Sequence, residues 1–301
     1  MKRLLTFFAG LCVMLSASGL AEARKNVLPD WQDPQIVQEN RLPMTASFQS
    51  GGLKLSLNGM WKFAWYETID SRSLDFYKMN YSDAGWDEMP VPGMWELNGY
   101  GDPVYKNVGY AWSGHYVNNP PYPALEHNYA VLYRRTFVIG EEWIGEDIFL
   151  RIGSATSNVR VWVNGKELGT RPYGYISFTY DITKHLKYGR QNTVRVKVDN
   201  SDQPNSRWYS GCGIYRNVWL TKTNAVHVAQ DGTFVTVADI TDSQATVNVA
   251  VDIVNNKNVP VRIDNVVFDA EGREVARGTD RMTVKSPKRW SVETPYLYSV
   301  T

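Results

Sequence analysis

The chain has 301 residues and a formal net charge of +1, because 32 lysines and arginines nearly balance 31 aspartates and glutamates. This length is enough for two domains of ordinary size, each with a hydrophobic core. Near-neutrality excludes the electrostatic attraction on which binding to nucleic acid or an anionic membrane depends, so an uncharged partner fits better. The 11 Trp and 18 Tyr suit carbohydrate stacking and large β-sandwich cores equally well.

The N-terminal residues have the composition of a secretory signal peptide. Lys2 and Arg3 precede an apolar run over residues 4–15, and small residues follow in Ala21-Glu22-Ala23. The apolar run is shorter than the roughly 20 residues that a membrane-spanning helix needs. We therefore expect a cleavable signal peptide over residues 1–23, a periplasmic or secreted mature protein, and no membrane anchor.

Cysteine and histidine form no disulfide or metal-binding pattern. Cys12 lies within the predicted signal peptide, which leaves Cys212 without a partner for an internal disulfide. The four histidines lack the spacing of metal ligands: His115, His127, His185 and His227.

Residues 24–49 are polar and proline-containing, which predicts an extended arm lying over a neighbouring surface. After them, Leu53, Leu55 and Leu57 alternate with polar residues, Asn58-Gly59 is a turn signal, and the alternation resumes over residues 60–65. This pattern predicts a β-hairpin.

The next part of the chain has a long aromatic loop and then regular strand patterns. Residues 99–123 are rich in Gly, Pro and Tyr, and such a loop is either functional or packed as its own cluster. Asn164-Gly165 is the strongest hairpin signal. Period-two alternation predicts strands over residues 133–138, 148–152, 159–163 and 194–198. Short strands without helical periodicity predict an all-β, jelly-roll sandwich over residues 50–222.

The composition changes after residue 222, where aromatic residues become sparse and valine-rich alternation continues to Phe268. This pattern, with further strands expected around Val259, Val261 and Ile263 and a turn at residues 269–272, predicts an immunoglobulin-like sandwich over residues 223–301. One or two more strands are expected after it. We therefore expect the second sandwich to be incomplete at Thr301 and the chain to be part of a longer protein.

Residues 206–220 form the stretch in which chemistry is most concentrated. Gly211 and Gly213 flank Cys212, which suits a tight turn with positive φ or close backbone approach, and a strand is expected to follow, with Tyr215 and Trp219 within it. Arg207 and Trp208 precede the turn in a loop, where binding residues concentrate. Aromatic rings stack on pyranose faces and guanidinium groups bind hydroxyls or carboxylates, so the stretch indicates a polyhydroxylated ligand; packing in a β-core corner is the alternative for Tyr215 and Trp219.

These residues resemble glycoside hydrolase family 2, and the chain as a whole is similar to the β-galactosidases of that family. The central match is residues 207–220 (RWYSGCGIYRNVWL). Further matches occur in order at residues 30–31 (DW), 39–41 (ENR), 56–63 (SLNGMWKF), 91–95 (VPGMW), 98–100 (NGY), 103–108 (PVYKNV) and 290–298 (WSVETPYLY). The resemblance implies a sugar-binding jelly roll and an immunoglobulin-like domain that precede a (β/α)₈ barrel carrying both catalytic glutamates.

The resemblance also implies which residues here contact substrate. Asn107 matches a loop asparagine that bonds galactose hydroxyls, and an amide can both donate and accept hydrogen bonds; capping its own turn is the alternative. The family's best-known members place an aspartate for a sugar hydroxyl and a sodium ion just before the signature Trp. Here Arg207 stands near that place, beside Trp208, and Asp202 is the only nearby acid. Sodium binding and strict galactose preference are therefore in doubt, while Arg216 is expected to fix the loop.

Two classes of function follow from this. The first is the N-terminal part of an exported β-galactosidase that acts on terminal β-galactosides of oligosaccharides. In this case the chain supplies substrate loops and lacks the catalytic carboxylates. β-Glucuronidase or β-mannosidase is the alternative within the family. The second is a non-catalytic carbohydrate-binding protein. This part of the chain implies no cofactor, whereas the resemblance allows sodium and magnesium in the full-length parent. It also implies contact with the C-terminal barrel and allows a homo-oligomer.

Overall fold

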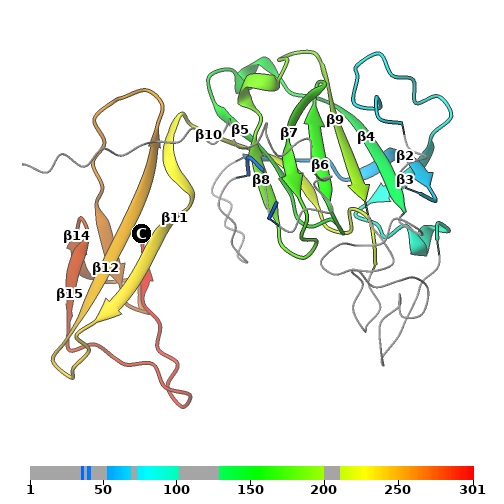
Figure 1. Cartoon of the computed structure of the whole chain (residues 1–301). Helices are drawn as coiled ribbons and strands as arrows, with labels where there is room; N and C mark the ends of the chain where they lie inside the picture. Colours follow the sequence, from blue (N-terminus) through cyan, green and yellow to red (C-terminus); the bar gives the residue numbers. More distant parts are fainter. Residues whose placement is uncertain (1–34, 37–38, 42–52, 69–72, 102–128, 200–210) are drawn as a thin grey trace, which may run out of the picture.

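We describe the protein from a computed structural model, which covers residues 35–36, 39–41, 53–68, 73–101, 129–199 and 211–301. This part of the chain is nearly all β-structure (Figure 1). The strands are β1 Leu53–Ser56, β2 Gly59–Tyr66, β3 Asp87–Val91, β4 Ala130–Val138, β5 Asp147–Ile152, β6 Val159–Val163, β7 Lys166–Arg171, β8 Phe178–Asp181, β9 Gln191–Asp199, β10 Val218–Thr223, β11 Val226–Ala238, β12 Gln244–Asn255, β13 Asn265–Phe268, β14 Glu274–Gly278, β15 Arg281–Lys285 and β16 Ser299–Val300. Three short 3₁₀ turns are described: η3 Glu96–Asn98, η4 Glu141–Trp143 and η5 Thr183–His185.

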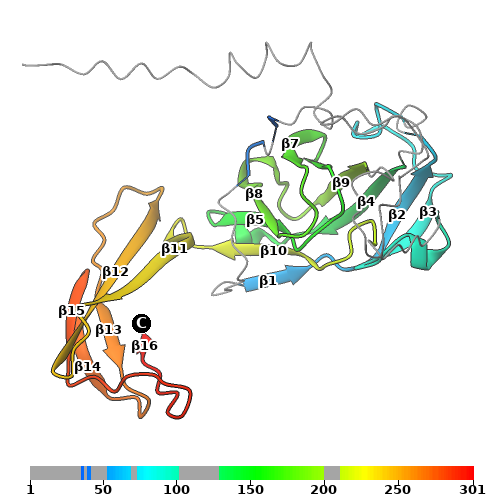
Figure 2. The ribbon, with the colours of Figure 1, turned by 60° about the horizontal axis from the view of Figure 1, so that its bottom comes forward.

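The first sandwich confirms the predicted jelly-roll class. A six-stranded sheet of order β3-β2-β4-β9-β6-β7 faces a four-stranded sheet of order β1-β10-β5-β8 (Figure 2). Period-two alternation sends one side of each strand into the shared core, which includes the fully buried Trp61, Phe63, Tyr133 and Ile148. Trp61 and Tyr133 meet edge to face with ring centroids 6.4 Å apart. The core therefore holds the two sheets in a fixed relation.

The six-stranded sheet is also covered on its outer face. Phe76, Leu132 and Trp162 form a second buried cluster there, and Tyr77 stacks on Trp162 at 5.7 Å. Central strand β9 is consequently buried along eight of its nine residues. Alternation alone could not predict this, because Arg195, Lys197 and Asp199 give the strand a polar side that is buried as well.

The predicted hairpin at Asn58-Gly59 is wrong. Strand β1 pairs with β10 in one sheet, whereas β2 pairs with β3 and β4 in the other, so the chain crosses between the two layers. The Asn58 side chain accepts from the Val218 backbone N–H at 2.9 Å and donates to Asn217 Oδ1 at 2.9 Å. The amide thus ties the crossing to β10, and this tertiary contact replaces the local hairpin turn.

The second sandwich confirms the predicted immunoglobulin-like class. It has two three-stranded sheets, of order β11-β12-β15 and β14-β13-β16, with a small core of Val247, Val249, Val267, Met282 and Val284. The predicted strand around Val259, Val261 and Ile263 is wrong: these residues form a connection, and both valines are exposed. Val235 and Val237 pair with the buried Val249 and Val247, yet they are 43% and 52% exposed.

The described part of the N-terminal arm lies against the edge strand β7. The Glu39 backbone N–H donates to Thr170 O at 3.2 Å, and Asn40 Nδ2 donates to Leu168 O at 2.7 Å. A Cβ on Gly169 would lie 2.2 Å from Glu39 O, so glycine permits this approach. These bonds place residues 39–40 against β7, while the arm over residues 24–49 as a whole stays a prediction. No helix among the described residues is long and apolar enough to cross a membrane.

Candidate functional site

Three of the family-like motifs, far apart in sequence, meet around the turn at residues 211–217. The Trp95 N–H donates to Cys212 O at 3.1 Å and the Gly93 N–H donates to Ile214 O at 3.0 Å. Glu96 Oε2 accepts from the Cys212 N–H at 3.0 Å. These bonds join residues 93–96 to the turn, while Asn58 joins the crossing before β2 to Val218. Together the bonds form a rigid backbone framework.

The two glycines of the turn allow this close packing. Gly213 has φ of +103°, and a Cβ there would lie 2.7 Å from the Tyr133 hydroxyl and 3.1 Å from Gly93 O. A Cβ on Gly211 would overlap the Met94 side chain. The prediction that this turn needs positive φ or close approach is therefore confirmed, by both at Gly213 and by close approach at Gly211.

The turn is bonded on its other side to residues 153–156 and to the β7–β8 loop. The Thr156 N–H donates to Gly213 O at 3.1 Å, and the Gly213 N–H donates to Thr156 O at 3.3 Å. The Tyr215 hydroxyl lies 2.8 Å from Ser154 Oγ, and both hydroxyls donate to Gly174 O. Tyr215 precedes β10, so the expectation that it lies within the strand is wrong. Its side chain connects the turn to Ser154 and to the β7–β8 loop.

The four predicted substrate-binding residues, Asn107, Asp202, Arg207 and Trp208, lie outside the described residues. Their positions stay a prediction. Arg216 is exposed at the turn. Trp219 lies on β10, half-buried, with the Lys54 ammonium 5.7 Å from its ring centroid, so it faces away from the core. Of the aromatic and guanidinium side chains singled out by sequence, the structure describes only Tyr215, Arg216 and Trp219.

Two segments that bear predicted substrate residues lie outside the described residues, and the residues that flank them lie close together. Residues 102–128 are flanked by Gly101 and Tyr129, and a Cβ on Gly101 would lie 3.7 Å from the Tyr129 ring. Residues 200–210 are flanked by Asp199, which pairs with Ala130 beside Tyr129, and by Gly211 beside Met94. An aromatic cluster supports this region, because Trp65 lies 5.0 Å from Tyr129 and 6.4 Å from Tyr100 between ring centroids. The flanking residues Gly101, Tyr129, Asp199 and Gly211 therefore lie at one end of the first sandwich.

The acidic groups near this end are already engaged. Asp199 Oδ2 is 2.6 Å from Lys197 Nζ, and both side chains are almost fully buried. Glu96 accepts the Cys212 N–H. Burial raises the pKa of the Tyr133 phenol above its usual value, so this hydroxyl stays protonated. Among the described residues, no group of three or more His, Cys, Asp or Glu could hold a metal ion.

Glu96, Ser154 and Gly174 support the turn structurally, and the sequence did not single them out. Glu96 follows the VPGMW motif directly, so its position beside a recognised motif was the available signal. Ser154 and Gly174 have no comparable signal, because their role depends on a tertiary contact with Tyr215.

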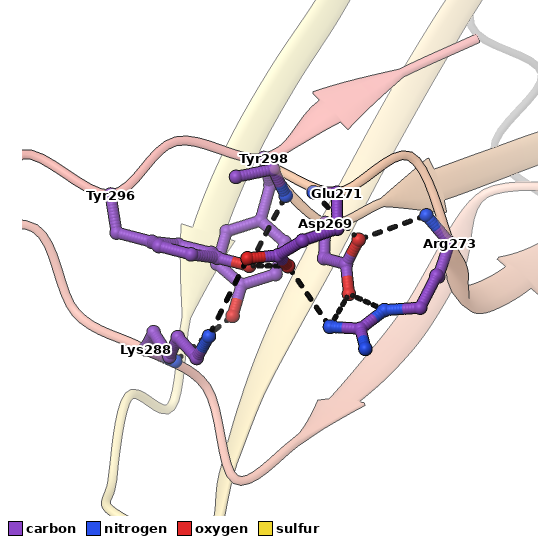
Figure 3. Close-up of polar contacts among 7 residues, drawn as sticks. Asp269, Glu271, Arg273, Lys288, Tyr296 and Tyr298 are labelled. Carbon is purple, nitrogen blue, oxygen red and sulfur yellow. Dashed lines mark hydrogen bonds and ion pairs between the residues drawn. The ribbon is translucent and has the colours of Figure 1, made fainter.

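A second polar cluster lies in the second sandwich, where the β13–β14 turn meets the loop before β16 (Figure 3). Asp269 accepts from the Glu271 and Arg273 N–H groups at 3.0 and 2.9 Å, and from Arg273 Nε at 2.8 Å. The Tyr296 hydroxyl donates to Glu271 Oε2 at 2.8 Å, and the Lys288 N–H donates to the Tyr298 hydroxyl at 2.9 Å. Burial opposes ionisation, but the Arg273 bonds and charge lower the pKa of Asp269 below its usual value. The cluster connects the loop before β16 to the β13–β14 turn.

Comparison with known proteins decides the family. Residues 54–224 match the family described as "Glycosyl hydrolases family 2, sugar binding domain", and residues 226–301 match "Glycosyl hydrolases family 2". The chain belongs to glycoside hydrolase family 2.

Individual members of this family are similar over much of the chain. β-Galactosidase BoGH2A of Bacteroides ovatus is 45% identical over 184 residues, which are 56% of this chain and 22% of that protein. A protein described as a putative β-glucuronidase of Formosa agariphila is 32% identical over 82% of this chain and 23% of its own length. The crystal structure of a β-glycosidase from Bacteroides vulgatus matches with a TM-score of 0.63 and 27% identity, over 83% of this chain and 31% of that one. This chain therefore spans less than a third of the length of each of these three proteins.

Proposed function

We propose that the chain is the N-terminal portion of an exported family 2 glycosidase that hydrolyses terminal, non-reducing β-D-galactosides. In this proposal the first sandwich supplies substrate-binding loops, and the catalytic carboxylates belong to a barrel later in the full-length protein. The observation that carries the proposal is the framework around residues 211–217. It supports, from one end of a rigid sandwich, the flanks of both segments that bear the predicted substrate residues.

The chemistry of the described residues supports a binding role. A retaining glycosidase needs two carboxyl groups about 5–5.5 Å apart, one of them a proton donor with a raised pKa. Glu96 and Asp199, the acids nearest the framework, are bonded to the Cys212 N–H and the Lys197 ammonium. We therefore propose neither Glu96 nor Asp199 as the catalytic acid or nucleophile. We propose instead that Asn107 bonds sugar hydroxyls while Arg207, Trp208 and Asp202 line the opposite side of the sugar.

The choice of galactoside rests on the 45% identity to a β-galactosidase over 184 residues. A β-glucuronidase is the second candidate, favoured by Arg207, because a guanidinium can pair bidentately with a uronate carboxylate, and by the relative described as a putative β-glucuronidase. A β-mannosidase is a further alternative of the same family. A non-catalytic carbohydrate-binding protein is the alternative from another class.

Export, ions and assembly complete the proposal. Residues 1–23 are proposed to be a signal peptide that directs the protein to the periplasm or outside the cell, because of their basic, apolar and small-residue order. Sodium and magnesium are proposed only for the full-length parent, as is a homo-oligomer. The partner within the same polypeptide is the proposed C-terminal barrel.

The test is to express the uninterrupted reading frame that contains this chain and to assay it with nitrophenyl β-galactoside, β-glucuronide and β-mannoside. We expect the highest kcat/KM for the galactoside. A higher value for the glucuronide or mannoside would move the assignment to that sugar. A reading frame without any barrel, together with no hydrolysis, would overturn the hydrolase proposal and favour the binding protein.

A further inference from the structure

The β7–β8 loop, residues 172–177, exposes two tyrosines beside the framework. Tyr173 and Tyr175 are 49% and 54% exposed, and their ring centroids are 5.5 Å apart at an interplanar angle of 66°. Within the described part of the first sandwich, they are the only aromatic side chains with this degree of exposure. All other described rings in that sandwich are at least partly buried. The pair therefore needs an explanation other than core packing.

The backbone between the two tyrosines is held firmly. Gly174 O accepts from both the Ser154 and Tyr215 hydroxyls, which lie 2.8 Å from each other. A Cβ on Gly174 would lie 2.6 Å from Thr156 Oγ1, so the loop is pressed against the segment that pairs with Gly213. Because the loop is fixed before binding, little conformational entropy remains to be lost when a ligand covers it.

The surroundings of the pair favour a sugar over an apolar partner. The Arg171 guanidinium lies 5.3 Å from the Tyr173 ring centroid, which covers one side of that ring and leaves Tyr175 as the more exposed ring. Ser154, Thr156 and Asn158 are buried beneath the loop, and Pro172 and Ile176 within it are half-buried. Two exposed phenol rings that carry their own hydroxyls suit the apolar face and hydroxyl rim of a pyranose.

We propose that Tyr173 and Tyr175 form an accessory sugar subsite that stacks one pyranose unit of a longer oligosaccharide. This inference rests on the proposed function, because it assumes a carbohydrate substrate for the framework. Tyr215 links the two places directly: its backbone lies in the 211–217 turn and its hydroxyl holds the tyrosine loop. In this proposal a longer oligosaccharide reaches the pair, whereas a disaccharide does not.

The test is calorimetric titration of the 301-residue chain with β-1,4-linked galactotetraose. Tyr175→Ala and Tyr173→Ala should each raise the Kd about five- to tenfold, the value of one aromatic stacking contact. Tyr175→Phe keeps the ring and should bind as the unaltered chain does. Phe234→Ala removes a 67% exposed ring from the second sandwich and is the matched control, with no change in Kd.

Melting temperatures of all four variants should match that of the unaltered chain, because the substituted side chains are largely exposed. Absence of tetraose binding by the unaltered chain, or equal Kd values for the alanine variants, overturns the subsite. If Phe234→Ala weakens tetraose binding as much as the tyrosine variants do, the sugar binds any exposed ring, and the subsite is overturned as well. The hydrolase proposal fails separately, through the assay of the full reading frame, so the two failures are distinguishable.

Discussion

The two sandwiches differ in how completely their layers cover each other. In the first, β9 is buried on both faces and large rings such as Trp61 and Tyr133 fill the core. In the second, the core consists of five mostly small side chains, and Val235 and Val237 face the interior while remaining 43% and 52% exposed. The first sandwich is supported by its own core, whereas polar contacts such as those of Asp269 contribute more to the second. This difference fits our proposal that the substrate loops extend from the first sandwich.

The largest expected effect is on the core of the first sandwich. Trp61 is fully buried, and its Nε1–H donates to Leu57 O at 2.9 Å. Trp61→Ala should lower the free energy of unfolding by about 3–5 kcal/mol, because it leaves a cavity and an unpaired carbonyl. Urea unfolding followed by Trp fluorescence measures it. A loss below about 1 kcal/mol would show that the core is less tightly packed than described.

The framework turn should be the next most sensitive place. Gly213→Ala combines a positive φ with a clash against Tyr133 and Gly93, so we expect a loss of about 2–4 kcal/mol. Gly272→Ala in the second sandwich also has positive φ, +77°, but open space around its Cα, and should lose only about 1 kcal/mol. Equal losses in the two variants would show that crowding at the turn contributes nothing to stability.

The stability of the second sandwich should fall at acid pH because Asp269 becomes protonated. Its pKa is lower in the folded state than in the unfolded chain, so its stabilisation is present above the unfolded pKa and is lost as pH falls through the folded pKa. Melting temperature measured between neutral pH and about pH 3 should fall less in Asp269→Asn than in the unaltered chain. Asp252→Asn removes an exposed carboxylate and is the control. Identical pH profiles for Asp269→Asn and the unaltered chain would contradict this role.

The smallest expected effect on stability comes from comparing an exposed and a buried position on two paired strands. Val235→Thr places a hydroxyl at a 43% exposed position and should change the free energy of unfolding by less than about 0.5 kcal/mol. Val249→Thr, opposite it on β12 and 2% exposed, should cost about 1–3 kcal/mol for a buried hydroxyl. Thermal unfolding of both variants checks this, and equal costs would mean that Val235 is covered in solution.

Sequence predicted the parts of the fold that local chemistry decides. Asn164-Gly165 forms the expected tight turn, with φ of 50° and 81°, because positive φ favours these two residues wherever they occur. The same dipeptide type at Asn58-Gly59 was misleading, because its amide bonds to β10 and the chain changes sheets. The edge strand β3 was not predicted, since only two of its five residues are buried and its alternation is weak. Val259 and Val261 alternate like a strand but pair with no strand among the described residues.

For the candidate site, motif spacing predicted the turn glycines, while the supports from Ser154 and Gly174 became visible only in three dimensions. No local pattern marks a hydroxyl whose partner lies 20 residues away in sequence. The roles of Asn107, Asp202, Arg207 and Trp208 are still predictions.

Asn107→Ala in the full-length protein tests the proposal that the first sandwich positions a loop asparagine for substrate. Losing a hydrogen bond made to the sugar in the transition state should cost about 1–3 kcal/mol, or roughly a 5- to 150-fold fall in galactoside kcat/KM. The melting temperature should stay within about one degree, because Asn107 lies outside the alternating core pattern. A large fall in melting temperature with unchanged galactoside kinetics would contradict the account.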